Sequence, residues 1–83
     1  MRYQLDLTLR QTEGALARVL GTAGRRGFRP LAVDGRALIE TGQPDGDRWH
    51  LRMTVEGERS DEQLQGQLAK LYDCLAVQVM PCP

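Results

Sequence analysis

The chain has few of the residues on which catalysis, metal binding or disulfide bonding depends. It contains one histidine, two cysteines and 5% aromatic residues, and its eleven basic and eleven acidic residues cancel. With no net charge, no overall field draws the chain to nucleic acid or to a membrane. No apolar run approaches the roughly 20 residues of a membrane span, and the N-terminus lacks the apolar core of a signal peptide. We therefore expect a cytoplasmic protein.

The two cysteines and the histidine do not form a recognisable site. Cys74 and Cys82 are eight positions apart, which is neither a metal-ligand spacing nor a disulfide framework, so we expect reduced thiols and no metal or other cofactor on this chain. Cys74 is expected to pack as a small apolar residue. His50 lies at an outward position of a predicted strand and is interpreted as a surface residue. Asp45 and Asp47 are interpreted as turn residues rather than an acid and base pair.

The length of 83 residues predicts a single domain over residues 1–83, near the lower limit at which one core is stable without metals or disulfides. A partner subunit would add stability. No internal linker or low-complexity stretch divides the chain.

The first half of the chain changes from a period of two to a helical period and back. Apolar and polar residues alternate over residues 3–10, which predicts a strand with one buried face. From Glu13 the apolar residues recur at helical spacing, and Gly27 is a natural stop for this helix. The pattern places Leu16, Val19, Leu20 and Ala23 on one stripe, with Arg18 and Arg25 pointing away. Residues 28–40 alternate again, interrupted by Gly35, which suggests a bulge or a close backbone approach.

The second half of the chain has a turn followed by the same order of strand, helix and strand. Residues 41–47 concentrate turn formers and predict a hairpin loop, and a strand follows over residues 48–56. Ser60 and Gln63 have the spacing of a capping box, and the stripe of a second helix continues through Leu64, Leu68 and Leu71. Residues 75–79 predict a last strand. The order βαββαβ predicts an α+β, ferredoxin-like fold, with two helices on one face of a four-stranded antiparallel sheet. In this fold the 28–40 strand lies at an edge, where it could pair with its copy in another chain.

This fold serves many functions, so function must come from particular residues. An RNA-recognition domain would show aromatics on the open sheet face, but Tyr3 and Trp49 have the parity of the buried face. We also find no Cys-x-x-Cys of a metal carrier and no match to the arginine loop of an acylphosphatase. A small ferredoxin-like enzyme remains a distant alternative.

Three positions remain as candidates for binding. Gly14 at the first helix start would let a small anion approach unpaired backbone N–H groups, although a glycine there could equally ease the turn. Arg25 and Arg26 either offset the helix dipole or contact an acidic partner surface.

The chain resembles the ACT domain, and most closely the regulatory small subunits of acetolactate (acetohydroxyacid) synthase. The resemblance rests on the runs Gly-Ala-Leu-Ala-Arg-Val-Leu at 14–20, Arg-Arg-Gly-Phe at 25–28 and Gln-Leu-Ala-Lys-Leu-Tyr-Asp at 67–73. It implies a non-catalytic subunit that binds and activates a large catalytic subunit in branched-chain amino acid biosynthesis. The cofactors of that large subunit are thiamine diphosphate, flavin and magnesium. The resemblance is strongest for the short, valine-insensitive isozyme type. The alternative is a free-standing ACT-type amino-acid sensor for another enzyme.

The family's pattern marks effector-binding candidates in this chain, listed here: Gln11, Glu13, Gly14, Ala15, Phe28 and Arg29. Valine-binding members show Asn-x-Pro-Gly before the first helix and an asparagine at the start of the second strand. Here the corresponding residues are Gln11-Thr12-Glu13-Gly14 and Arg29. Glu13 puts a negative charge where a ligand carboxylate would arrive, which costs roughly a kcal/mol or more. These departures predict that any amino-acid effector binds weakly. The small core and the open edge of the 28–40 strand predict a homodimer.

Overall fold

The computed structural model describes residues 1–38 and 48–82. The predicted hairpin loop at 41–47, with Ile39 and Glu40 of the predicted strand, lies outside the described residues. The elements are β1 (Arg2–Arg10), α1 (Ala15–Arg25), β2 (Arg29–Leu38), β3 (Arg48–Glu56), α2 (Asp61–Ala69) and β4 (Cys74–Pro81). This order confirms the predicted βαββαβ arrangement.

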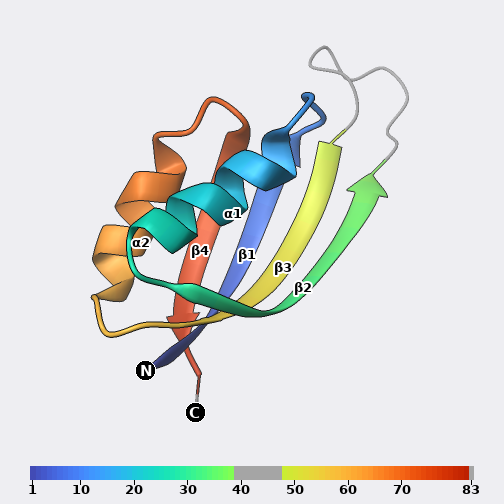
Figure 1. Cartoon of the computed structure of the whole chain (residues 1–83). Helices are drawn as coiled ribbons and strands as arrows, with labels where there is room; N and C mark the ends of the chain where they lie inside the picture. Colours follow the sequence, from blue (N-terminus) through green and yellow to red (C-terminus); the bar gives the residue numbers. More distant parts are fainter. Residues whose placement is uncertain (39–47, 83) are drawn as a thin grey trace.

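The four strands form one antiparallel sheet in the order β2-β3-β1-β4. Both helices lie on one face of this sheet, and β2 and β4 are its edges (Figure 1). The ferredoxin-like α+β fold and the edge position of the second strand are therefore confirmed. No described helix is long and apolar enough to cross a membrane.

The core forms between the helices and the inward face of the two central strands. Alternate residues of β1 and β3 point to the helices because successive strand side chains point to opposite faces. They meet the apolar stripes of the two helices. α1 buries Val19 and Ala23 in this core, and α2 buries Leu64 and Leu68. The strand residues of this core are Tyr3, Leu5, Leu7, Leu9, Leu51, Met53, Val55 and Val79. The predicted core faces are confirmed for these elements.

The predicted helix ends are also largely confirmed. Ser60 caps α2, where its hydroxyl accepts a hydrogen bond of 3.3 Å from the N–H of Gln63. Gly27 follows the end of α1 with φ 87°, the left-handed conformation that glycine adopts without a Cβ penalty. Leu71 is half-buried against the core, but α2 ends at Ala69. The observed helix is therefore shorter than the apolar stripe from which it was predicted.

The edge strand β2 has two irregular features. Its register against β3 shifts between Pro30 and Ala32 rather than at Gly35. A Cβ on Gly35 would lie 3.5 Å from the Trp49 ring. Of the two predictions for Gly35, the structure therefore confirms the close backbone approach and not the bulge. Leu31 and Val33 are 42% and 43% exposed because no described element covers them.

Candidate functional site

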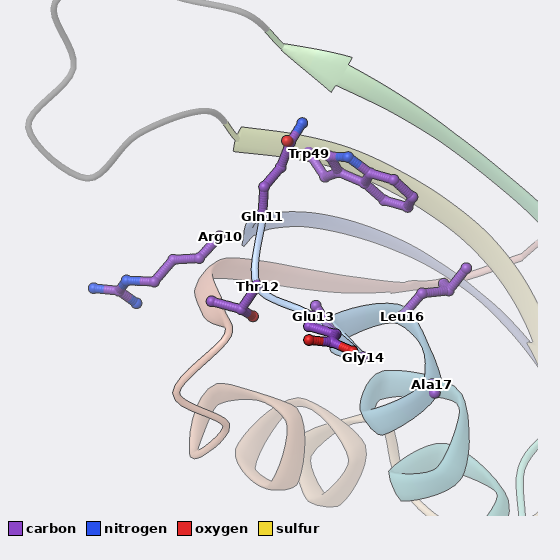
Figure 2. Close-up of a pocket in the computed structure, with 9 residues that line it drawn as sticks. Arg10, Gln11, Thr12, Glu13, Gly14, Leu16, Ala17 and Trp49 are labelled. Carbon is purple, nitrogen blue, oxygen red and sulfur yellow. The ribbon is translucent and has the colours of Figure 1, made fainter.

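A hollow of about 350 Å³ lies where β1 leads into α1. In Figure 2 Gln11 stands beside the Trp49 ring, Leu16 reaches toward the same side from α1, and Arg10 points away. Leu16 and Trp49 are half-buried and form an apolar wall, while Gln11 donates a long hydrogen bond of 3.5 Å to the carbonyl of Arg48. The residues that line the hollow are Arg10, Gln11, Thr12, Glu13, Gly14, Ala15, Leu16, Ala17 and Trp49.

The conformation of Gly14 creates the rim of this hollow. Gly14 is the N-cap of α1 with φ 78° and ψ 8°, a left-handed conformation that costs other residues roughly 1–2 kcal/mol. A Cβ there would also lie 3.0 Å from Nη1 of Arg18. The first helical bond runs from the N–H of Arg18 to the carbonyl of Gly14 at 3.0 Å. The N–H of Ala15 donates to the carbonyl of Thr12 at 3.1 Å. The next two amides of α1 have no carbonyl acceptor among the described residues, which favours a negative group at this end.

An ion pair between the exposed side chain of Arg18 and the buried carboxylate of Asp73 holds the loop before α1 in place. The guanidinium of Arg18 donates two hydrogen bonds to the carboxylate of Asp73, from Nε to Oδ2 at 2.7 Å and from Nη2 to Oδ1 at 2.8 Å. The hydroxyl of Thr12 donates to the same carboxylate, and Nη2 of Arg18 donates to the carbonyl of Glu13 at 2.6 Å. We call these residues, Thr12, Arg18 and Asp73, the loop clamp. The clamp ties the loop before α1 to the turn between α2 and β4.

The clamp shifts the ionisation of both charged partners. Asp73 is 2% exposed, and its hydrogen bonds from Arg18 and Thr12 hold the pKa of its carboxyl far below the usual range, because they outweigh the effect of burial. The hydrogen bond to Asp73 likewise raises the pKa of Arg18. The pair therefore stays charged near neutral pH.

The structure brings four of the predicted effector residues together and separates the other two. Gln11, Glu13, Gly14 and Ala15 line the hollow, with Glu13 exposed and Ala15 buried. The other two, Phe28 and Arg29, follow the opposite end of α1.

The side chains of those two residues are occupied elsewhere. Phe28 is 2% exposed in the core, where its ring meets Tyr3 edge-to-face at 6.0 Å. Arg29 is exposed and pairs with Glu56 at 2.9 Å. Hydrogen bonding from Arg2, aided by the charge of Arg29, lowers the pKa of Glu56. Whether the six residues serve one ligand stays a prediction.

The remaining candidates have ordinary structural surroundings. His50 lies on the helix-free face of the sheet, with Nε2 3.3 Å from Oδ1 of Asp6. Cys74 is half-buried, and burial raises the pKa of its thiol, which keeps it protonated and unreactive near neutral pH. Arg25 donates to the hydroxyl of Thr22 at 3.3 Å, and Arg26 donates to the side-chain carbonyl of Gln67 at 2.9 Å. Within residues 1–38 and 48–82, no group of three or more His, Cys, Asp or Glu side chains could hold a metal ion.

Sequence reasoning missed the loop clamp and the wall of the hollow. Arg18 was expected to point away from the fold, but its guanidinium turns back to Asp73, 55 positions along the chain. No local pattern marks Asp73, because its neighbours have no clear period. The strand pattern predicts Trp49 in the core, whereas the structure has it half-buried at the hollow, a place that follows from the pairing of β1 with β3.

Comparison with known proteins gives a consistent family. The profile of the ACT domain family matches residues 11–77. The chain is 34% identical over 77 residues to the acetolactate synthase small subunit of Buchnera aphidicola. It is 35% identical over 77 residues to the acetolactate synthase isozyme 3 small subunit of Escherichia coli. Each match covers 93% of this chain but only 46% and 45% of the relatives, so the chain spans less than half their length.

Solved structures show the same fold. The acetolactate synthase small subunit of Thermotoga maritima superposes with a TM-score of 0.75 at 22% identity, covering 100% of this chain and 50% of that one. The ACT domain from the GTP pyrophosphokinase of Chlorobium tepidum gives a TM-score of 0.71 at 11% identity, over 96% of this chain and 97% of that domain. At these identities the likeness concerns the fold alone.

Proposed function

Since the chain belongs to the ACT domain family, we propose that it is a non-catalytic regulatory small subunit of an acetolactate synthase, acting in branched-chain amino acid biosynthesis. In this role it binds the large catalytic subunit and raises its activity. The observation that carries the proposal is the 34–35% identity to acetolactate synthase small subunits over 93% of the chain. The thiamine diphosphate, flavin and magnesium belong to the large subunit.

A subunit without chemistry of its own can activate an enzyme only through coupling free energy. It must bind the active conformation of the large subunit more tightly than the inactive one. A rigid binding surface supports this role, because less conformational entropy is lost on binding. The loop clamp contributes such rigidity, since it fixes the start of α1 to the turn before β4.

We propose that the subunit is a homodimer through β2 and α1. β2 is an edge strand, and its backbone groups on that side can pair with a second copy. Leu31 and Val33 are exposed on this strand and would be covered by such a contact. Burial of these side chains would supplement the small core of a single chain.

We propose that valine binds weakly or not at all. Two amides in the first turn of α1 have no carbonyl acceptor among the described residues, but the carboxylate of Glu13 lies at the same rim and repels a ligand carboxylate. Gln11 and Arg29 stand where valine-binding members have asparagines. Valine titrated into labelled protein should leave the amide signals of residues 11–16 and 28–31 nearly unmoved at millimolar ligand.

The converse variant tests the same reasoning. Gln11→Asn, Glu13→Pro and Arg29→Asn together should increase valine affinity, and proline at position 13 keeps the carbonyl that accepts from Arg18. Saturable shifts at micromolar valine in the unchanged protein would contradict this prediction.

The function itself is tested by adding the purified chain to its large subunit. Acetolactate production should rise with added chain and saturate, while the chain alone shows no turnover. The Asp73→Asn variant, which weakens the clamp, should activate less at equal concentration. If activity, cofactor retention and elution position of the large subunit are all unchanged by excess chain, the proposal is wrong.

The alternative is a free-standing ACT-type sensor of an amino acid for another enzyme. The hollow at the start of α1 favours it, because such a hollow could hold a ligand without a large subunit. A panel of amino acids distinguishes the two proposals: tight binding of one of them, with no effect on a synthase large subunit, would support the sensor. A gene for a large thiamine-dependent synthase beside this one would support the regulatory subunit.

A further inference from the structure

The strand β4 is an edge of the sheet and has no charged side chain in its eight residues. Each of the other three strands carries two arginines and one carboxylate. Charged side chains are one of the main features by which soluble proteins keep a sheet edge from pairing with another chain. β4 therefore lacks, at an edge, the protection that the other strands have.

Most of β4 is also regular enough to accept a further strand. Its pairing with β1 shifts register opposite Thr8 and Leu9, at the start of β4. From Ala76 to Pro81 each residue then lies opposite one residue of β1, without a further shift. A bulge within this part would twist the edge away from a second chain. The edge from Ala76 to Pro81 has no such bulge.

The backbone groups of alternate β4 residues point away from the sheet. The N–H of Cys82 donates to the carbonyl of Arg2 at 2.9 Å, and an antiparallel ladder repeats this contact at every second residue. The even-numbered residues of β4 therefore bond to β1, whereas the N–H and carbonyl groups of Val77 and Val79 point to the open edge. Within residues 1–38 and 48–82, no strand or loop pairs with these groups. Pro81 belongs to the same outward series and has no N–H to leave unpaired.

The β4 side chains beside this edge are uncharged on both faces of the sheet. On the helix side Val79 is buried and Val77 is half-buried. On the opposite side Ala76 and Gln78 are exposed, and Met80 is 38% exposed. In strand addition the backbone hydrogen bonds supply affinity and the flanking side chains supply specificity. The chemistry that fits is therefore an extended segment whose side chains are uncharged and mostly apolar.

The presence of two edges decides between a second copy and a different chain. The homodimer proposed above occupies β2, where it would cover the exposed Leu31 and Val33. If β4 also paired with its own copy, each chain would join two others and the sheet would grow into a fibre. A segment of another protein ends the sheet, because it need not offer a second free edge. The proposed function supplies such a protein, the catalytic subunit.

We infer that the β4 edge docks the catalytic subunit, by accepting an extended, uncharged segment of that partner as a further strand beside residues 76–81. The inference rests on the proposed function and adds the place and the chemistry of the contact. The N–H and carbonyl groups of Val77 and Val79 hold the segment through backbone hydrogen bonds. β2 lies at the opposite edge of the sheet (Figure 1) and stays free for the second copy.

Hydrogen exchange of the full chain, with and without its large subunit, tests the contact at single amides. In the free chain the amides of Val77 and Val79 should exchange quickly, whereas those of Gln78 and Met80 should exchange slowly because they bond to β1. With the large subunit bound, exchange at Val77 and Val79 should slow roughly tenfold or more. Gln78 and Met80 should change little, so the signature is an alternation along β4.

A proline at position 77 tests the same contact by binding. Val77→Pro removes an N–H that takes no part in the pairing with β1, and it should raise the Kd for the large subunit roughly tenfold, because a partner carbonyl loses its donor. Val77→Ala is the matched control: it also shortens the side chain but keeps the N–H, and it should stay within about threefold of the unchanged chain. Circular dichroism and thermal melting check that each variant is folded. If Val77→Pro does not fold, the exchange pattern of the unchanged chain decides.

The outcomes separate the docking edge from the function. If the chain binds and activates the large subunit while Val77 and Val79 stay unprotected, the docking edge is wrong and the proposed function stands. Equal weakening by Val77→Pro and Val77→Ala would overturn strand addition, because the side chain and not the N–H would then carry the contact. Protection of Val77 and Val79 in the free chain that is lost on dilution would assign the edge to a second copy and overturn the inference. If the unchanged chain does not bind the large subunit, both proposals fail.

Discussion

Replacing Asp73 with asparagine removes the charge of the loop clamp without changing its shape. In the variant, the amide oxygen can still accept a hydrogen bond from the Thr12 hydroxyl. The amide nitrogen, however, replaces a carboxylate oxygen that accepts from Arg18 at 2.7 or 2.8 Å, so two donors face each other there. At least one charge-assisted hydrogen bond is therefore lost. The loop before α1 loses its strongest tie to the turn before β4.

The cost follows from the burial of the two partners. A hydrogen bond to a charged group contributes about 1.5–3 kcal/mol, and removing one partner of a fully buried pair costs about 3–5 kcal/mol. Asp73 is buried, but the Arg18 side chain is 48% exposed, so water compensates the guanidinium in the variant. We expect a loss of about 2 kcal/mol in the free energy of unfolding, or a melting temperature lower by about 10 °C for a domain of this size.

The effect should depend on pH with a defined sign. The folded-state pKa of Asp73 is depressed below its unfolded value, so the clamp stabilises the fold above the unfolded pKa of about 4 and loses this contribution as the pH falls further. Urea unfolding at several pH values should therefore show a constant gap between the two proteins above about pH 5. Below about pH 4 the gap should narrow.

Asp6→Asn is the matched control, because it makes the same change at a partly exposed carboxylate with longer contacts of 3.3 Å. It should cost no more than about 1 kcal/mol. Equal costs for the two variants, or a gap at Asp73 that does not change between pH 7 and pH 3, would refute the reasoning.

Three further outcomes follow from the geometry. Gly14→Ala should destabilise the protein by roughly 1 kcal/mol or more in urea unfolding, because its φ is 78° and a Cβ would meet Arg18; an unchanged midpoint would contradict this. Ser60→Ala should cost about 1 kcal/mol through the lost cap of α2, with loss of amide protection at Gln63 as its signature. Sedimentation at micromolar concentration should show a dimer that Val33→Lys converts to a monomer, whereas Ala32→Lys, on the opposite face, should not.

The elements were predictable because their signals are local. Alternation in β1 and β3 and the helical stripe of α1 each arise from a few neighbouring residues, and the observed burial follows them. The Ser60 cap was predictable for the same reason. The order of elements then restricts the topology, since βαβ crossovers are right-handed.

The loop clamp and the exposure of β2 were not predictable in this way. Thr12 and Arg18 meet Asp73 only after β4 pairs with β1, so their contact depends on the completed sheet. The alternation of β2 correctly indicates an apolar face, but it does not reveal that the helices lie over other strands and leave Leu31 and Val33 exposed. Both features depend on neighbours distant in sequence.

The effector candidates lie at opposite ends of α1, and this separation links the proposed effector site to the proposed homodimer. α1 has 11 residues and is therefore about 16 Å long, so Gln11 before it and Arg29 after it cannot both contact one amino acid within a single chain. In an antiparallel pairing of two β2 edges, the start of one β2 lies beside the end of the other. The end of β2 is near the hollow, because Ala37 pairs with Trp49. Arg29 of a second copy would thus approach the hollow of the first. A ligand that contacts both Gln11 and Arg29 would therefore itself be evidence for the dimer, and a monomer could hold only half of the site that the family pattern marks.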